Sequence, residues 1–315
     1  ESFHELLLRG LNQGDRVAIY LDKTTESVIA LYGVWSAGGV AVPVNETLKR
    51  RQIEHIARDS GARFLVTSRK RLARLDHEIT GDIEVVVADE PTGNSVCAAV
   101  DAGPGGDQPA AILYTSGSTG RPKGIVISHA NLLAGCRIVT RYLGIRFDDR
   151  LLSVLPFSFD YGLNQLLTAI SAGATLVLHR SPMPADICRA LVEHEITACA
   201  GVPPMWIQLM SGVSPFRQMT FPRLRYITNS GGRFPVALLR QYREHLPAVR
   251  IYLMYGLSEA FRSTFLDPDE VDRRPDSMGR EMPETEILVL DPDGNPCSPD
   301  GIGELVHDGP TVAIG

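Results

Sequence analysis

The residues best suited to chemistry form one short run, YTSGSTGRPKG, at Tyr114–Gly124. Glycines let a backbone approach an anion closely and take positive φ, and successive N–H groups in such a loop form an anion-binding nest. Lys123 adds a positive charge that suits phosphate. The run therefore predicts a phosphate-binding loop, although Gly, Ser and Thr are also common in flexible surface linkers. It is not a Walker loop, because Gly124 follows the lysine where Ser or Thr is required.

The segments around this loop alternate between strand-like and helix-like patterns. Strands are expected at 16–21, 40–44, 63–67, 82–88, 111–114, 151–155, 175–178, 224–228 and 250–254. Helices are expected at 25–36, 50–60, 130–142, 163–171, 184–194 and 235–245. Such alternation predicts an α/β fold with a mainly parallel sheet. The tail differs, because 286–290, the turn 291–294 and 303–307 are typical of an antiparallel hairpin.

Composition excludes several classes of protein. Of 315 residues, 44% are hydrophobic and 22% are charged, which excludes a disordered tail, a coiled coil and a collagen-like fibre. The net charge of -6 argues against a nucleic-acid partner. The five cysteines contain no C-x-x-C pair, so we expect neither a zinc site nor a disulfide framework, and a cytoplasmic location. The uncharged stretch 28–44 is shorter than a membrane span and is interrupted by glycines, and residues 1–9 lack a signal-peptide pattern, so no membrane partner is expected.

Together with IVISHANL at 125–132, the loop resembles the signature phosphate loop of the adenylate-forming superfamily. That superfamily includes acyl-CoA synthetases, the adenylation domains of nonribosomal peptide synthetases, and firefly luciferase. Further stretches resemble its motifs in the same order: WSAGGVAVPV at 35–44, LPFSFD at 155–160, NSGG at 229–232, YGLSE at 255–259 and GIGELVHDG at 301–309. The overall run also resembles acyl-CoA ligases associated with bacterial exosortase gene clusters. The resemblance covers nearly the whole chain.

The resemblance implies residues for ATP and Mg²⁺. Those implied to cradle the β- and γ-phosphates are Thr115, Ser116, Gly117, Ser118, Thr119, Gly120 and Lys123. Those implied to line the adenine pocket are Ser230, Gly231, Gly232 and Tyr255, and Gly256 is also implied to bind ATP. Ser258, where the family usually has Thr, is implied to contact the α-phosphate, and Glu259 to hold Mg²⁺, a hard cation that binds carboxylate and phosphate oxygens. Lys123, Ser258 and Glu259 are thus the candidate catalytic residues. Taken alone, Tyr255 is typical of an aromatic residue in a core and Glu259 of an acid on the surface. Their order after the phosphate loop favours the adenine-binding and Mg²⁺-binding roles.

The acid-binding residues follow from the same resemblance: Asp160, Tyr161, Asn164, Gly201, Ile227, Asn229, Met254, Arg262 and Ser263. Amino-acid-activating members keep an aspartate at the position of Asp160, where it pairs with the substrate's ammonium, and a buried carboxylate needs such a partner. Arg262 is an alternative partner for Asp160. The set is too polar for a long fatty acyl tail, so an amino acid or a short polar acid is expected.

The implied reaction is activation of a carboxylate by ATP to an acyl-AMP, with release of pyrophosphate. A thiol, on CoA or on an acyl or peptidyl carrier protein, then takes the acyl group. A degenerate adenylation domain that only binds nucleotide is the alternative, against which Lys123 and Glu259 argue. A kinase-like transferase lacks support, because the sequence has neither an H-R-D motif nor a Walker lysine.

The implied fold is the large N-terminal domain of the adenylate-forming enzymes, with two mixed α/β subdomains and a distorted β-barrel part. We expect the first subdomain at 1–102, with an incomplete N-terminus, the second at 108–280 with the phosphate loop and acid pocket, and the start of the barrel part at 281–315. The ribose-binding aspartate and the C-terminal lid domain with its adenylation lysine are expected beyond Gly315, outside this chain.

Overall fold

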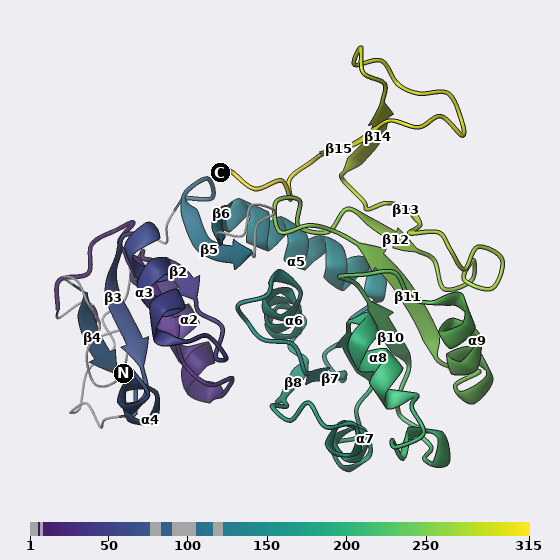
Figure 1. Cartoon of the computed structure of the whole chain (residues 1–315), viewed down its shortest axis with the longest axis horizontal. Helices are drawn as coiled ribbons and strands as arrows, with labels where there is room; N and C mark the ends of the chain where they lie inside the picture. Colours follow the sequence, from purple (N-terminus) through teal and green to yellow (C-terminus); the bar gives the residue numbers. More distant parts are fainter. Residues whose placement is uncertain (1–5, 7–8, 76–82, 90–104, 116–121) are drawn as a thin grey trace. The chain divides into compact units, whose positions relative to one another are not determined.

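The computed structural model describes residues 6, 9–75, 83–89, 105–115 and 122–315. Its contacts divide the chain into two compact units. Figure 1 shows the helices and strands, coloured along the sequence. The first unit comprises Glu1–Leu132, Pro156–Leu163 and Ala313–Gly315, and the second comprises Leu133–Leu155 and Asn164–Val312. The boundary differs from the expected one at 102–108, because the strands on either side of the phosphate loop extend the sheet of the first unit.

Six strands form the sheet of the first unit, in the order β4-β3-β1-β2-β5-β6. Neighbouring strands are parallel, except for β5 and β6. The strands are β1 (Arg16–Tyr20), β2 (Val40–Pro43), β3 (Ala62–Thr67), β4 (Glu84–Val87), β5 (Pro109–Thr115) and β6 (Lys123–Ser128). The helices are α2 (Thr25–Ser36), α3 (Arg50–Asp59) and α4 (Arg69–Ala73). The predicted mainly parallel α/β sheet is confirmed, with the antiparallel strand β6 as an addition.

Helix α2 begins and ends at the predicted residues. At its start, the N–H of Thr24 donates to Ser27 Oγ at 3.2 Å. At its end, Gly38 takes a left-handed conformation with φ 77°, which ends a helix at little steric cost. Trp35 Nε1 donates to the carbonyl of Ala110 at 2.8 Å and so ties α2 to β5. The uncharged stretch 28–44 is therefore a helix end, a glycine turn and a strand, and none of the helices in the described ranges is long and apolar enough to cross a membrane.

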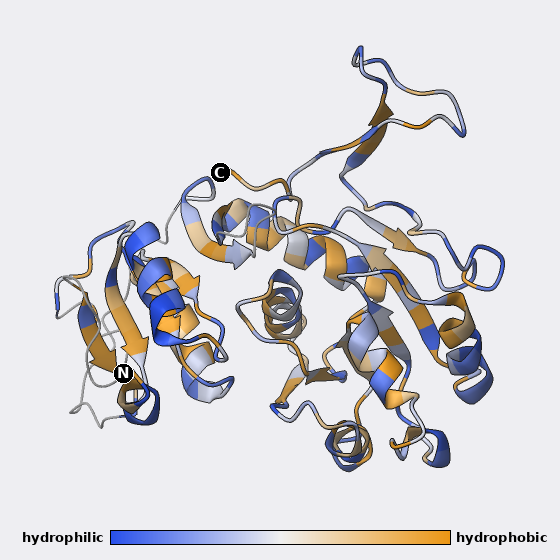
Figure 2. Ribbon diagram, viewed as in Figure 1, coloured by the Kyte–Doolittle hydropathy of each residue, from blue (hydrophilic) through white to orange (hydrophobic). Residues whose placement is uncertain are grey.

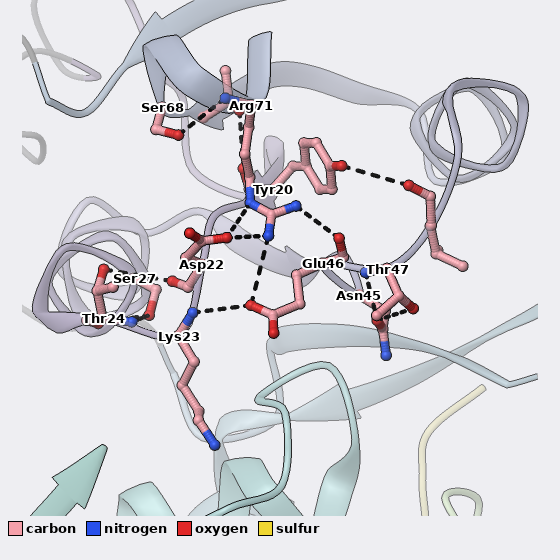
Figure 3. A network of polar contacts seen from close by, with 12 residues as sticks. Tyr20, Asp22, Lys23, Thr24, Ser27, Asn45, Glu46, Thr47, Ser68 and Arg71 are labelled. Carbon is pink, nitrogen blue, oxygen red and sulfur yellow. Dashed lines mark hydrogen bonds and ion pairs between the residues drawn. The ribbon is translucent and has the colours of Figure 1, made fainter. Parts of the chain in front are cut away.

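A buried arginine holds the ends of three elements of the first unit together (Figure 3). The side chain of Arg71 is 4% exposed, and its Nε donates to Asp22 Oδ1 at 2.6 Å. Its Nη1 donates to the carbonyl of Glu46 at 2.7 Å, and its guanidinium lies 4.7 Å from the ring centre of Tyr20. The segments after β1, after β2 and in α4 thus meet at one cation, which Asp22 and Glu46 neutralise.

Seven strands form the sheet of the second unit, in the order β13-β12-β11-β10-β9-β7-β8. The strands from β11 to β8 are parallel, and β12 and β13 are antiparallel additions. The strands are β7 (Arg150–Ser153), β8 (Thr175–Leu178), β9 (Ala198–Gly201), β10 (Tyr226–Asn229), β11 (Arg250–Tyr255), β12 (Thr264–Leu266) and β13 (Arg280–Glu281). The helices are α5 (His129–Leu143), α6 (Asp160–Ser171), α7 (Pro184–Glu193), α8 (Pro203–Leu209) and α9 (Val236–His245), of which α5 and α6 begin in the first unit.

The largest core of the second unit lies between this sheet and helices α7, α8 and α9. Ile227 of β10 and Ile251 of β11 pack there against Trp206 of α8 and Tyr242 of α9. The rings of Trp206 and Tyr242 meet edge to face, with centroids 5.6 Å apart. Figure 2 shows the strands mostly in hydrophobic colours and the outer end of α9 in hydrophilic ones, as expected where one helix face is buried.

The tail forms the predicted antiparallel hairpin of β14 (Glu286–Leu290) and β15 (Glu304–Asp308), labelled in Figure 1. Its register pairs Leu288 with Val306. The cysteines in the described ranges, Cys136, Cys188, Cys199 and Cys297, are free, and Cys97 lies outside those ranges.

Candidate active site

Strands β5 and β6 hold the two ends of the expected phosphate loop side by side. Thr115 and Lys123 are opposite each other in the antiparallel ladder, and the side chain of Lys123 is exposed. Next to them, a Cβ on Gly124 would lie 3.1 Å from Tyr114 Cζ and 2.8 Å from a methyl group of Ile112, so only glycine fits without displacing these side chains. The other loop residues, Ser116, Gly117, Ser118, Thr119 and Gly120, lie outside the described ranges.

The expected adenine segment is a turn directly after β10. Asn229 Nδ2 donates to the carbonyl of Gly232 at 2.9 Å and closes the turn. Gly231 has φ 74°, a conformation that disfavours residues with a Cβ. Ser230 is buried, whereas Gly231 and Gly232 are exposed. The turn thus presents an exposed, side-chain-free backbone at the carboxyl end of a parallel strand, where α/β proteins commonly bind ligands.

The expected α-phosphate and Mg²⁺ residues lie on a tight loop between β11 and β12. The N–H of Ser263 donates to the carbonyl of Tyr255 at 2.9 Å and closes the loop at its base. A Cβ on Gly256 would be 2.9 Å from the backbone nitrogen of Arg262, so the two sides of the loop approach as closely as glycine allows. Ser258 is half-buried and Glu259 is exposed at the end of the loop.

This arrangement fits Mg²⁺ bound together with phosphates. Within the described ranges, no group of three or more His, Cys, Asp or Glu side chains is placed to hold a metal ion. If the exposed carboxylate of Glu259 holds the ion as expected, phosphate oxygens and water would supply the remaining ligands. Mg²⁺ is commonly bound in this way, through one or two carboxylates and substrate phosphates.

The expected acid-binding residues occupy several elements. Asp160 and Tyr161 begin α6, and Asn164 follows Asp160 by four residues, which places Asp160 and Asn164 on one side of that helix. Each of these three side chains is at most 4% exposed. Nδ2 of Asn164 is buried and has no hydrogen-bond partner among the described residues, so it is available to a ligand acceptor.

The sheet register divides the remaining acid-binding residues between two faces. Asn229 pairs with Gly201 of β9 in the ladder, and Ile227 lies on the same face, within the core around Trp206. Met254 of β11 lies on the opposite face, where its sulfur accepts a hydrogen bond from the hydroxyl of Tyr142. The register therefore separates Met254 from Ile227 and Asn229.

Two polar residues that the sequence analysis did not select lie close to expected site residues. Thr228, 2% exposed, pairs with Tyr252 in the ladder and so lies on the same face as Met254. His307 of β15 contacts Ser263, with its Nδ1 2.8 Å from Ser263 Oγ. The alternation of side chains along strand β10 would have been enough to place Thr228 on the face opposite Ile227. His307 lies in the motif GIGELVHDG at 301–309, but nothing in that motif indicated its contact with Ser263, which lies 44 residues earlier.

Comparison with known proteins identifies a family and several relatives. The family model described as "AMP-binding enzyme" matches residues 4–315. The chain is 30% identical to an L-proline--[L-prolyl-carrier protein] ligase of Pseudomonas fluorescens, over 97% of this chain and 64% of the relative. It is also 30% identical to a 2-succinylbenzoate--CoA ligase of Bacillus velezensis, over 97% of this chain and 61% of the relative. The chain thus spans less than two thirds of these relatives.

A solved structure agrees with these matches. O-succinylbenzoate coenzyme A synthetase from Bacillus subtilis, in complex with ATP and magnesium ion, superposes with a TM-score of 0.88 and 27% identity. The match covers 100% of this chain and 64% of that chain. The expected mixed α/β N-terminal domain of the adenylate-forming fold is thereby confirmed for this chain.

Proposed function

The chain belongs to the AMP-binding enzyme family, and on that premise we propose that it is part of an enzyme that joins a carboxylic acid to a thiol through an acyl-AMP. The observation that carries the proposal is the family match over residues 4–315, which contain every motif expected for ATP in this part of the chain. Relatives named as ligases of a carrier protein and of CoA support both possible thiols.

The proposed first step is a substitution at phosphorus. An oxygen of the carboxylate attacks the α-phosphorus of ATP, the bond from that phosphorus to the bridging oxygen breaks, and pyrophosphate leaves with its electron pair. In the second step a thiol sulfur attacks the acyl carbon, its proton is lost to solvent, and AMP leaves. Neither step needs a covalent enzyme intermediate, so the protein acts by positioning two anions and offsetting their charge.

Each proposed role rests on a local feature of the structure. Lys123, exposed at the start of β6 and opposite Thr115, supplies positive charge to the phosphates. The backbone of the turn at 230–232 and the ring of Tyr255 bind adenine. Ser258 contacts the α-phosphate, and Glu259 holds Mg²⁺ on a loop that is closed at its base. Bound Mg²⁺ neutralises negative charge on the phosphates and on the leaving pyrophosphate.

The proposed acid is an amino acid or another short polar acid. Asp160 is 4% exposed and Asn164, one turn later on α6, is 2% exposed, so the α6 contribution to the acid site is polar and shielded from water. Nδ2 of Asn164 has no hydrogen-bond partner among the described residues, and a site with such a buried polar group discriminates strongly against a ligand that leaves it unpaired. A long apolar tail is therefore disfavoured.

A degenerate domain that binds ATP without reacting is the competing function, and one assay separates the two. Full-length protein is incubated with Mg-ATP, labelled pyrophosphate and a panel of amino acids, short hydroxy acids and benzoic acids. We expect label to enter ATP only when a suitable acid is present. If calorimetry detects ATP binding while no acid supports exchange, the degenerate domain is the correct alternative.

A further inference from the structure

Tyr114 ties the strands that hold the expected phosphate loop to the end of helix α3. In the ladder, Tyr114 of β5 pairs with Gly124 of β6. Its ring lies over that glycine, because a Cβ on Gly124 would be 3.2 Å from the hydroxyl oxygen of Tyr114. The same hydroxyl donates to Asp59 Oδ2 at 2.6 Å, and Asp59 is the last residue of α3. We call these three residues the tyrosine brace.

The hydroxyl of Tyr114 donates to Asp59 at any physiological pH. Burial raises the pKa of this phenol far above its usual 10, and the hydrogen bond and negative charge of Asp59 raise it further. A short O–H···O⁻ bond of this kind is about twice as strong as a bond between neutral groups. Helix α3 is itself fixed, because Ile53 and Ile56 are buried in the core against which Tyr114 also packs. The bond to Asp59 therefore sets the direction of the ring.

The hydrogen bond of the brace adds position rather than satisfying a buried group. Asp59 is exposed and Tyr114 is half-buried, so water would hydrate the carboxylate if the ring turned away. Thr115 directly follows Tyr114, and Lys123 directly precedes Gly124, opposite Thr115 in the ladder. A ring that is fixed between the two strands therefore fixes the two residues from which the expected phosphate loop begins.

We propose that Tyr114 is a positioning residue, which acts through Gly124 and Asp59 to hold Lys123 in the conformation that binds the phosphates of ATP. The inference rests on the proposed function of the loop and adds to it Asp59, a residue of α3 outside the phosphate motif. The physical reason is preorganisation. A lysine whose backbone is already held loses less conformational entropy when it binds a phosphate.

The first test measures the dissociation constant of Mg-ATP by calorimetry on the full-length protein, and so does not depend on turnover. Tyr114→Phe keeps the ring and removes the hydroxyl, and should raise this constant about 10-fold, the effect of one hydrogen bond to a charged group. Asp59→Ala should raise it by a similar factor. Because loss of a negative charge alone would favour an anion, weaker binding by Asp59→Ala reports loss of the brace. An unchanged dissociation constant in Tyr114→Phe overturns the proposal.

The second test asks whether Tyr114 and Asp59 act together. The double variant Tyr114→Phe/Asp59→Ala should bind Mg-ATP no more weakly than Tyr114→Phe alone. Asp59→Asn, whose amide oxygen still accepts a hydrogen bond, should keep much of the wild-type affinity. The control is Arg58→Ala, an exposed neighbour on α3, which should change the affinity little. In the pyrophosphate exchange assay, Tyr114→Phe should raise KM for ATP more than it lowers kcat. Additive losses in the double variant overturn the joint role.

A measurement without ligand separates this inference from the proposed function. Amide hydrogen exchange of the full-length protein, followed by mass spectrometry, should be about 10-fold faster in Tyr114→Phe over peptides of β5 and β6, and unchanged over β10 and β11. If hydrogen exchange and ATP binding respond as expected but no acid supports pyrophosphate exchange, the ligase function fails and the brace stands. If pyrophosphate exchange in Tyr114→Phe keeps the wild-type KM for ATP, the brace fails and the ligase function stands. A wild type that binds no ATP overturns both.

Discussion

At the scale of single residues, the proposed chemistry depends most directly on Glu259. Its carboxylate is exposed on a loop whose two sides approach within the limit set by Gly256. Within the described part of the chain no group of three or more metal-binding side chains is placed to hold an ion, so the proposed Mg²⁺ site depends on this carboxylate.

We therefore expect Glu259→Gln to lower the rate of pyrophosphate exchange by about 10²-fold or more, because the amide keeps the shape and loses the charge that holds Mg²⁺. The rate is measured against Mg²⁺ concentration, and circular dichroism checks that the fold is intact. Glu281→Gln, an exposed carboxylate on β13, is the matched control. A near-normal rate at limiting Mg²⁺ would show that Glu259 is not the metal ligand.

Asp160 allows two readings that mutation can separate. If it meets a substrate ammonium, Asp160→Ala should abolish activation of an amino acid and spare its analogue without the amino group. The physical reason is that a buried ammonium without a counter-charge costs about 3–5 kcal/mol, and the analogue never needs that partner. If Asp160 pairs with Arg262 instead, both substrates should suffer equally, and Arg262→Ala should reproduce the loss. Exchange assays on wild type and both variants decide.

At the scale of elements, one carboxylate holds three strands of the second unit in position. Asp149, directly before β7, is 1% exposed. Its Oδ1 accepts hydrogen bonds from Nη2 of Arg225 at 2.7 Å and from Nε of Arg225 at 3.1 Å. Thr197, before β9, donates to the same oxygen at 2.6 Å. Burial alone would raise the pKa of Asp149, but the hydrogen bonds of Arg225 and Thr197 hold it below the usual 3.8.

The sign of the pH dependence follows. Since the folded pKa lies below the unfolded value, the contribution to stability is complete above the unfolded pKa and is lost as pH falls through the folded pKa. We expect Asp149→Asn to lower the free energy of unfolding by about 3 kcal/mol at neutral pH. The difference in unfolding free energy between wild type and Asp149→Asn should shrink below about pH 4. Urea unfolding at both pH values tests this, with the exposed neighbour Asp148→Asn as control. A difference in unfolding free energy that does not change with pH would contradict the role of an ionised Asp149.

Arg71 has the corresponding role in the first unit. Arg71→Met leaves Asp22 and Glu46 without the buried cation that joins three elements, and we expect a loss of about 3 kcal/mol in unfolding free energy. Arg71→Lys should lie between, because a lysine keeps the charge and loses the planar fork. Lys70→Met, an exposed cation on the same helix, should change stability little. Equal effects for Arg71→Met and Lys70→Met would contradict the role.

Local signals explain which elements the sequence predicted. The N-terminal cap at Thr24 and the left-handed Gly38 fix α2 at its predicted ends. Strand β9 and helix α8 were not predicted. ACAG is too short for a periodic pattern, and Pro203 and Pro204, which begin a helix here, are also typical of turns. Strand β6 was missed because its residues were interpreted only as part of the phosphate motif.

The sequence predicted the motifs of the candidate site, but it did not predict which residues of the site contact one another. YGLSE identified a loop, but its closure by Ser263 and the approach of Gly256 to Arg262 depend on how two strands pair. The split of Ile227 and Met254 between sheet faces follows from the register of β10 with β11. The contact of His307 with Ser263 spans 44 residues, a separation over which no sequence periodicity carries information.

At the scale of the whole molecule, the two proposed steps differ in what they require from outside the chain. Adenylation needs only ATP, Mg²⁺ and the acid, whereas release of AMP needs a thiol. An acyl-AMP is a reactive mixed anhydride, and a site that excludes water protects it from hydrolysis until the thiol arrives. The full-length protein should therefore store one acyl-AMP for each active site when the thiol is absent.

We expect rapid-quench measurements on the full-length protein to show a burst of pyrophosphate close to one equivalent when no thiol is present, followed by a slow phase limited by release or hydrolysis of the acyl-AMP. Adding CoA or a pantetheinylated carrier protein should turn the burst into continuous turnover with equal amounts of AMP and pyrophosphate, and the thiol that does so identifies the acceptor. Hydroxylamine should trap the stored intermediate as a hydroxamate, while acid-free and ATP-free controls yield none. Formation of ADP and phosphate in place of AMP and pyrophosphate would contradict adenylation, because it places the attack at the γ-phosphorus and returns the kinase-like reaction to consideration.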